Sequence, residues 1–185
     1  MKTLIFDCDG VLLDSERLLN QVFSECLADI GLHLTVEETI ENFKGISTKD
    51  CFTKLKNQWG LIPPDHFEGD YEKRAINRYN THLEIIPHID VVLNELACYS
   101  KCVASGSNPE RVRHGLTQKQ LIHHFGDAVF TSTQVKRGKP EPDLFLFSAE
   151  QMGVDYTQCI VIEDSTPGVQ AAVAADMIVL GFADI

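Results

Sequence analysis

The spacing of hydrophobic residues changes along the chain, and this change predicts two kinds of structure. Across residues 16–30, apolar side chains recur three or four positions apart, which is typical of one face of an amphipathic helix, and Gly31 follows as a stop. Thr35 and Glu38 have the capping-box pattern that begins a second helix. Two further helices are expected over residues 47–58 and from Pro64 towards residue 80.

A different pattern begins near residue 87, where short apolar runs alternate with helical segments. Elements that alternate in this way wind into a parallel sheet. The chain therefore predicts an α/β fold, a doubly wound parallel sheet formed by residues 1–14 and 84–185, with a helical insert over residues 15–83 after the first strand. The expected elements are helix 88–97, strand 102–105, helix 109–119, strand 128–131, helix 142–152, strand 159–163, helix 167–175 and strand 177–181.

Charged residues stand where the first apolar run ends. The run over residues 3–6 is followed by Asp7, Asp9 and Gly10, and these residue types are unfavourable inside a strand. The two carboxylates would therefore lie at the tip of a sheet, where metal and phosphate sites occur. Taken alone, the pair is explained equally well by a solvated turn.

Three later segments have the same form, an apolar run that ends in polar residues. They include Ser105-Gly106-Ser107-Asn108, then Gly138-Lys139-Pro140-Glu141-Pro142-Asp143, and finally Glu163-Asp164-Ser165-Thr166-Pro167-Gly168. In this order and spacing, the four segments resemble the signature motifs of the haloacid dehalogenase superfamily, specifically its magnesium-dependent phosphatases and β-phosphoglucomutase-like enzymes. The resemblance implies strand order 5-4-1-2-3, a helical cap for the insert, and one crevice that collects all four motifs at the carboxyl ends of the strands.

The acidic residues of that crevice require a cation. Four acids close together would repel one another, and Mg²⁺ prefers oxygen ligands and often binds one or two carboxylates together with a substrate phosphate. We expect direct ligands from the Asp7 carboxylate, the Asp9 backbone carbonyl and Asp164, with Glu163 acting through water. The alternative is that Glu163 and Asp164 only cap the helix over 167–175.

The resemblance assigns catalytic roles to four residues. Asp7 is the expected nucleophile, forming an aspartyl phosphate, and Asp9 the expected acid and then base. Lys139 and Ser105 are expected to stabilise the transferred phosphoryl group. As alternatives, Lys139 could be a solvated surface charge and Ser105 a helix cap. The residues expected to bind the substrate from the core are Gly106, through its N–H, and Asn108.

The insert contains a candidate specificity loop over residues 43–49. Lys44, Gly45 and Lys49 form a glycine turn between two lysines, which suits an acidic or polyhydroxylated leaving group, although an ordinary connection between helices would look the same. The expected function is hydrolysis of a small phosphorylated metabolite, a sugar or sugar-acid phosphate. Three alternatives stay open: a sugar phosphomutase, a phosphonoacetaldehyde-hydrolase-like enzyme using a cap lysine as a Schiff base, and a catalytically silent binding protein.

Composition narrows the expected partners and location. The net charge of −11 disfavours nucleic acid and anionic membranes as partners. No apolar stretch approaches the roughly 20 residues that span a bilayer, and no signal sequence is evident, so we expect a cytoplasmic protein. Its expected oligomeric state is a monomer or a weak homodimer. The six cysteines lack metal-ligand spacing and are interpreted as reduced core residues.

Two features depart from the family pattern. Pro87 is followed by His88, where relatives usually have glycine at the return from cap to core. The chain also ends just after the fifth expected strand, at Ile185, whereas the family pattern continues through another helix and strand. We therefore expect either that one side of the sheet is less covered or that the full protein has further residues.

Overall fold

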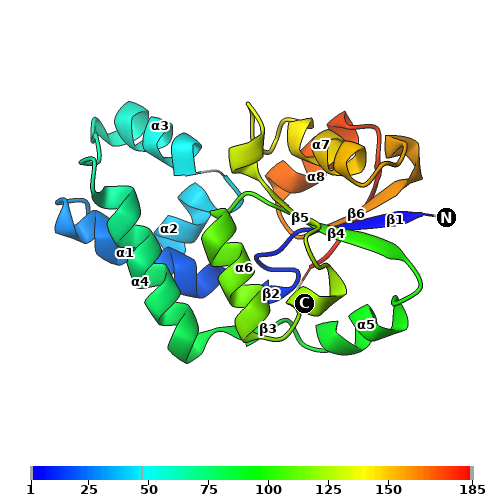
Figure 1. Ribbon diagram of the computed structural model, residues 1–185. Helices are drawn as coiled ribbons and strands as arrows, with labels where there is room; N and C mark the ends of the chain where they lie inside the picture. Colours follow the sequence, from blue (N-terminus) through cyan, green and yellow to red (C-terminus); the bar gives the residue numbers. More distant parts are fainter. Residues whose placement is uncertain (1, 47, 184–185) are drawn as a thin grey trace.

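The computed structural model of the chain describes residues 2–46 and 48–183 (Figure 1). Five parallel strands form one sheet in the order β5-β4-β1-β6-β7, which confirms the predicted order 5-4-1-2-3 read from the opposite edge. The strands are β1 (Thr3–Phe6), β4 (Ser100–Ser105), β5 (Val129–Thr131), β6 (Cys159–Glu163) and β7 (Ile178–Gly181).

Helices cover both faces of this sheet because side chains alternate along each strand. On β1, Leu4 and Phe6 belong to an apolar cluster with α5 (Ile89–Glu95) and α6 (Pro109–Gln118). Ile5 points the other way, into a second cluster with α7 (Asp143–Gln151) and α8 (Thr166–Ala174). Short 3₁₀ turns complete the core at η1 (Ile122–His124), η2 (Ser132–Gln134) and η3 (Tyr156–Gln158).

The insert contains four helices over the described residues, and no strand of the five-stranded sheet separates them from β1. They are α1 (Glu16–Asp29), α2 (Val36–Phe43), α3 (Thr48–Trp59) and α4 (Phe67–His82). The predicted capping box of Thr35 and Glu38 is present. Ser47, the predicted start of the third helix, lies outside the described residues. The fourth helix begins at Phe67 and not at Pro64, because a turn closed by a hydrogen bond from the Phe67 N–H to the Pro64 carbonyl comes before it.

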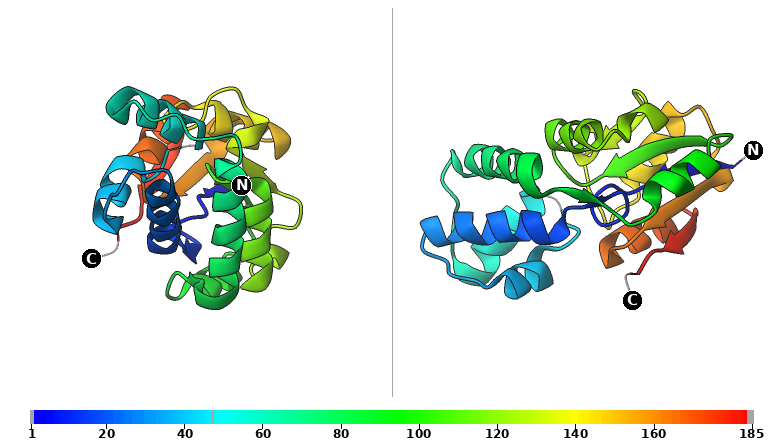
Figure 2. Two further views of the ribbon diagram at one scale, coloured as in Figure 1. Left: turned by 90° about the vertical axis from the view of Figure 1, so that its left-hand side faces the viewer. Right: turned by 90° about the horizontal axis from the view of Figure 1, so that it is seen from below.

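The chain enters and leaves the insert side by side. Strand β2 (Leu13–Asp14) pairs antiparallel with β3 (Glu84–Ile85), a ribbon that the sequence did not predict. Within the insert, the ring of Phe23 contacts three other aromatic rings edge-on, those of Phe43, Phe67 and Tyr71. The same apolar cluster includes residues of the core, so the insert packs against the sheet at the carboxyl end of β1 (Figure 2).

The structure bears on the expectations for His88, for the cysteines and for the cover of the sheet. His88 has φ +67°, a left-handed conformation that favours glycine, at the position where the family resemblance leads us to expect glycine. All six cysteines are free, but Cys98 is exposed, which corrects its assignment to the core. On β7, Ile178 and Leu180 are both about half exposed.

Within the described residues, no helix has the length and apolar character that a membrane crossing requires.

Candidate active site

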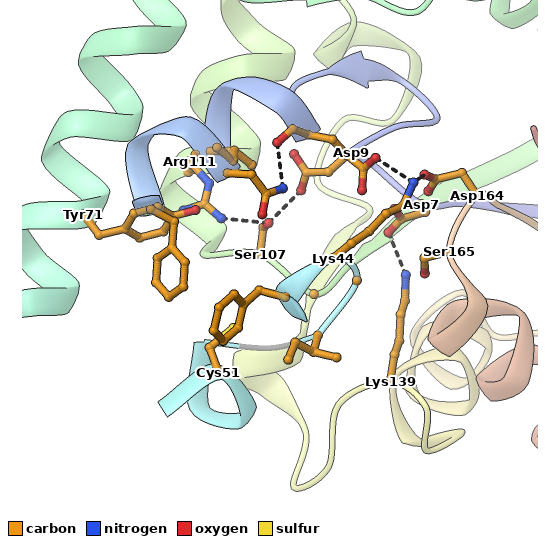
Figure 3. A pocket seen from close by; sticks show the side chains of 18 residues that line it. Asp7, Asp9, Lys44, Cys51, Tyr71, Ser107, Arg111, Lys139, Asp164 and Ser165 are labelled. Atoms are coloured by element: carbon orange, nitrogen blue, oxygen red, sulfur yellow. Dashed lines mark hydrogen bonds and ion pairs between the residues drawn. The ribbon is translucent and has the colours of Figure 1, made fainter. Parts of the chain in front are cut away.

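A cavity of about 110 Å³ lies between the carboxyl ends of the strands and the helical insert (Figure 3). Seven of the residues predicted from the sequence line it: Asp7, Asp9, Lys44, Gly45, Gly106, Lys139 and Asp164. Ser105 and Glu163 are fully buried and do not line it. Lys49 and Asn108 lie instead along a neighbouring cavity that shares Gly106 and Ser107 with the first.

The end of β1 brings the two aspartates into this cavity. The N–H of Asp7 donates to the carbonyl of Ile162 on β6 at 2.9 Å, which continues the sheet by one bond past Phe6. Gly10 then turns the chain with φ +88°, and a Cβ at this position would overlap the carboxylate of Asp164. Glycine is therefore required here both by the backbone conformation and by the close approach of Asp164.

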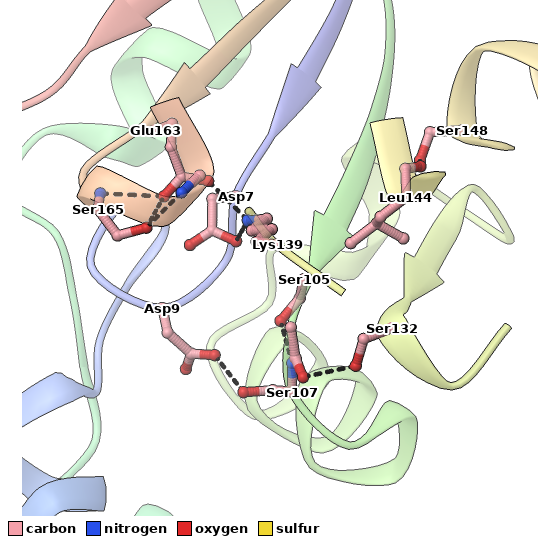
Figure 4. Close-up of polar contacts among 12 residues, drawn as sticks. Asp7, Asp9, Ser105, Ser107, Ser132, Lys139, Leu144, Ser148, Glu163 and Ser165 are labelled. Carbon is pink, nitrogen blue, oxygen red and sulfur yellow. Dashed lines mark hydrogen bonds and ion pairs between the residues drawn. The ribbon is translucent and has the colours of Figure 1, made fainter. Parts of the chain in front are cut away.

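Lys139 is buried between two carboxylates (Figure 4). Its Nζ lies 2.6 Å from Asp7 Oδ1 and 2.6 Å from Glu163 Oε2. Burial would lower the pKa of Lys139, but the charges of Asp7 and Glu163 raise it above its ordinary value. Burial, together with the charge of Glu163, raises the pKa of Asp7 by more than Lys139 lowers it. Lys139 is therefore a charged group inside the site, and the solvated-surface alternative is wrong.

Glu163 is held from both sides. Oε1 accepts hydrogen bonds from the Ser165 N–H at 3.0 Å and the Ser165 hydroxyl at 2.8 Å, while Oε2 pairs with Lys139. Ser165 is the N-cap of α8, and its Oγ accepts from the N–H of Gly168 at 3.1 Å. The cap of α8 is thus Ser165, while Glu163 pairs with the buried Lys139 and Asp164 lines the cavity.

Asp7, Glu163 and Asp164 form a candidate metal site. Each offers a carboxylate oxygen, and these oxygens lie within 4.8 Å of one another. Burial raises the pKa of Asp164, although the hydrogen bond from Lys44 opposes this. The donors fit Mg²⁺, because all are hard oxygen atoms and a cation would relieve the cost of keeping buried carboxylates ionised. Both Glu163 oxygens already accept protein hydrogen bonds, so a water-mediated contact to metal would share one of them.

Asp9 accepts hydrogen bonds at both carboxylate oxygens. Oδ1 accepts from the hydroxyls of Ser15 and of Tyr79, the latter at 3.1 Å, and Oδ2 accepts from the hydroxyl of Ser107 at 2.7 Å. The Ser105 hydroxyl does not bond to Asp9 directly but accepts a hydrogen bond from the Ser107 N–H at 3.0 Å.

Asn108 has a structural partner near the site. It is the N-cap of α6, and its side chain accepts from the N–H of Glu110 at 2.9 Å. The alternative that Ser105 caps this helix is therefore wrong, because the cap is Asn108. Ser107 is consequently left to contact Asp9.

The insert contributes a second lysine to the site. Lys44 Nζ lies 2.6 Å from Glu16 Oε2 and 3.0 Å from Asp164 Oδ2, so it bridges the insert and the core. Burial lowers the pKa of Lys44, but the hydrogen bonds to Glu16 and Asp164 raise it by more. Gly45 has φ +75°, and a Cβ there would lie 2.8 Å from the Cβ of Ser165, so the loop packs tightly on the start of α8.

Sequence reasoning missed four residues that bond to the predicted site residues, directly or through one another: Glu16, Tyr79, Ser107 and Arg111. Arg111 is only 4 % exposed, although it stands in a charged stretch that resembles a solvated helix face. Its Nη2 donates to Ser107 Oγ at 2.8 Å, a contact four residues apart that a helix starting at Pro109 makes feasible.

The sequence of this chain is similar to that of known phosphatases. A sequence profile described as haloacid dehalogenase-like hydrolase matches residues 4–182. The chain is 27 % identical to the 6-phosphogluconate phosphatase of Escherichia coli K12 over 98 % of this chain and 82 % of that protein. It is 32 % identical to the fructose-1-phosphate phosphatase of the same organism, over 94 % and 92 % of the two chains.

Solved structures show the same relationship. A haloacid dehalogenase-like protein of unknown function from Agrobacterium tumefaciens matches with a TM-score of 0.79 and 33 % identity, covering 98 % of this chain and 82 % of the other.

Proposed function

This chain belongs to the haloacid dehalogenase-like hydrolase family, and we propose that it hydrolyses the phosphate ester of a small sugar or sugar acid through an aspartyl phosphate on Asp7. The observation that carries the proposal is the buried cluster of Asp7, Lys139 and Glu163, next to a cavity that Asp7, Asp9 and Asp164 line. We assign residues 1–14 and 84–185 as the catalytic core and residues 15–83 as its cap.

In the first step, Asp7 attacks phosphorus. Lys139 occupies Oδ1 of Asp7, so we assign Oδ2 as the atom that forms the new bond to phosphorus while the bond to the leaving oxygen breaks. Protonated Asp9 gives its proton to that leaving oxygen. Lys139 and Gly106 line the cavity, and we assign the Lys139 ammonium and the Gly106 N–H to the charge on the phosphoryl group. Ser105 stays a predicted donor, although its side chain is buried and does not line the cavity.

In the second step, water attacks the aspartyl phosphate. Asp9, now a carboxylate, takes a proton from the water as its oxygen bonds to phosphorus, and the bond from phosphorus to Asp7 breaks to release inorganic phosphate. Mg²⁺ held by Asp7, the Asp9 carbonyl and Asp164 would offset negative charge on the phosphoryl oxygens. The insert forms one wall of the cavity through Phe43, Lys44 and Gly45, and we assign to it the role of limiting access of bulk water between the two steps.

The substrate class is supported by the insert wall and by the relatives. Lys44 and Gly45 face the cavity, next to an apolar surface that includes Phe23 and Phe43. Relatives acting on phosphorylated carbohydrates include the two phosphatases above and a hexitol phosphatase from Escherichia coli. A phosphorylated sugar or sugar acid fits both observations, with Lys44 bonding to a carboxylate or hydroxyl of the leaving group.

The phosphonoacetaldehyde-hydrolase alternative is disfavoured by the state of the cap lysines. A Schiff base forms only from a neutral amine, whereas Lys44 is paired with Glu16 and Asp164, and these contacts raise the pKa of its ammonium above the ordinary value. Lys49 lies outside the main cavity. A mutase would share the core residues, and it is identified by a requirement for a bisphosphate activator.

The test is phosphate release with Mg²⁺ across a panel of sugar, sugar-acid and nucleotide phosphates, with wild type and Asp7→Asn side by side. We expect turnover of a few sugar esters by wild type alone. Lys44→Met should raise KM for the best substrate, while Lys73→Met, an exposed lysine of α4, should not. Equal turnover by Asp7→Asn would refute the mechanism, and an unchanged KM for Lys44→Met would refute the role of the loop.

A further inference from the structure

Helix α4 of the insert reaches Asp9 by two separate routes. The first is direct, because the Tyr79 hydroxyl donates to Asp9 Oδ1 at 3.1 Å. The second runs through three residues: Glu72 Oε1 accepts from Arg111 Nη1 at 2.6 Å, Arg111 Nη2 donates to Ser107 Oγ at 2.8 Å, and Ser107 donates to Asp9 Oδ2 at 2.7 Å. Tyr79 and Glu72 are seven residues apart, which places them on one face of α4.

These routes pass through a tightly packed contact between α4 and α6. Tyr79 is 1 % exposed and Arg111 is 4 % exposed. A Cβ at Gly115 of α6 would lie 3.1 Å from the Tyr79 ring, so glycine permits the two helices to approach closely. The guanidinium of Arg111 also stands 5.3 Å from the ring centre of Tyr71 on α4. The hydroxyl of Tyr79 therefore has little freedom to move away from Asp9.

Stability alone does not explain the buried ion pair in the second route. Among the described residues, Arg111 Nε and Glu72 Oε2 are buried without a hydrogen-bond partner. Buried pairs of this kind are often replaceable by apolar residues without loss of stability, because the desolvation cost offsets the attraction. The Glu72–Arg111 ion pair is explained if it holds the Ser107 hydroxyl in place, because that hydroxyl donates to Asp9 Oδ2.

We propose that Tyr79 and Arg111 are positioning residues that hold the Asp9 carboxyl group in the orientation from which it protonates the leaving oxygen. This inference rests on the proposed function, in which Asp9 is the acid. Ser107 connects Arg111 to Asp9, because it accepts a hydrogen bond from Arg111 and donates one to Asp9. Through these contacts, α4 links the insert to proton transfer. Neither residue touches the phosphoryl group in this account.

The test uses two esters that differ in their need for an acid. An alkyl ester, the best sugar phosphate of the panel, has a leaving alkoxide that must be protonated, whereas p-nitrophenyl phosphate releases a stable anion without help. The quantity compared is kcat/KM, because it reports leaving-group departure and excludes the later hydrolysis of the aspartyl phosphate. Tyr79→Phe removes only the hydroxyl and keeps the ring.

We expect Tyr79→Phe to lower kcat/KM for the sugar phosphate by about tenfold and to leave that for p-nitrophenyl phosphate within about twofold. Arg111→Met should change the ratio of the two values in the same direction. The ratio is insensitive to partial misfolding, since a loss of folded enzyme lowers both values equally. Arg78→Met, which breaks the α4 ion pair with Glu25, is the matched control and should leave the ratio unchanged.

An equal loss on both esters, or no loss on either, for Tyr79→Phe would overturn the positioning role. That result differs from failure of the proposed function, which would show as absence of phosphate release by wild type from both esters. If Arg111→Met does not fold, Tyr79→Phe alone decides the inference.

Discussion

A methyl group added at Gly168 would strike the most buried carboxylate of the site. Gly168 lies in the first turn of α8, and a Cβ there would overlap the carboxyl carbon of Glu163. A surface carboxylate would swing aside at little cost. Glu163 is fully buried and bonded to Ser165 and Lys139, so Gly168→Ala must either displace this carboxylate or shift α8.

The bonds that the displaced carboxylate would lose set the expected cost. They are the contacts to Lys139 Nζ at 2.6 Å, to the Ser165 N–H at 3.0 Å and to the Ser165 hydroxyl at 2.8 Å. Removing one partner of a buried ion pair costs about 3–5 kcal/mol. Since Asp7 still pairs with Lys139, we expect the free energy of unfolding to fall by about 3 kcal/mol. Loss of the Glu163 contact would leave Lys139 held by Asp7 alone, and the resulting shift of its ammonium group should lower kcat by about 10²-fold.

Urea unfolding followed by circular dichroism, together with kcat for the best ester, measures both effects. Gly69→Ala in α4 is the matched control, because a Cβ there meets nothing within 4 Å. Alanine should raise the unfolding free energy there by about 0.5–1 kcal/mol without changing kcat. If Gly168→Ala unfolds within about 1 kcal/mol of wild type and keeps its kcat, Glu163 does not hold Lys139 in the way described.

Two further predictions concern pH and a buried lysine outside the site. Because the folded-state pKa of Asp164 is raised, its ionisation opposes folding: the stability it contributes is present below its unfolded pKa and is lost as pH rises through the folded pKa. Asp164→Asn should therefore raise the Tm of the metal-chelated protein more at pH 7 than at pH 4, and a gain independent of pH would contradict the assignment. Lys101 donates to the carbonyls of Leu96 and Tyr99 at 3.0 and 3.3 Å, so Lys101→Met should lower the unfolding free energy by about 1–3 kcal/mol. Its kcat should stay unchanged, and lost activity in the folded variant would refute a purely structural role.

The strands and the acidic residues at their ends were predictable because their signals are local. The run over 159–163 matches β6 at both ends, and Asp7 and Asp164 follow their strands directly. A parallel sheet brings such strand ends together, so local patterns suffice to place these acids in one cavity.

The remaining site residues depend on contacts between distant parts of the chain. Tyr79 stands at a helical core spacing and bonds to Asp9, 70 residues away. Arg111 resembles a solvated helix residue until α4 covers it. Nothing in their neighbourhood in the sequence distinguishes these two from ordinary core and surface positions. His88 was recognised as a departure from the family pattern, but its left-handed backbone required the structure.

The central claim is that Asp7 carries the phosphoryl group during turnover. The most direct measurement is an acid quench of wild type and Asp7→Asn during a single turnover of the best ester, labelled in its phosphoryl group. We predict a protein-bound label that rises and decays in wild type, is released by hydroxylamine as an acyl phosphate should be, and is missing from Asp7→Asn. Release of labelled inorganic phosphate by wild type with no protein-bound label at any time would contradict the account.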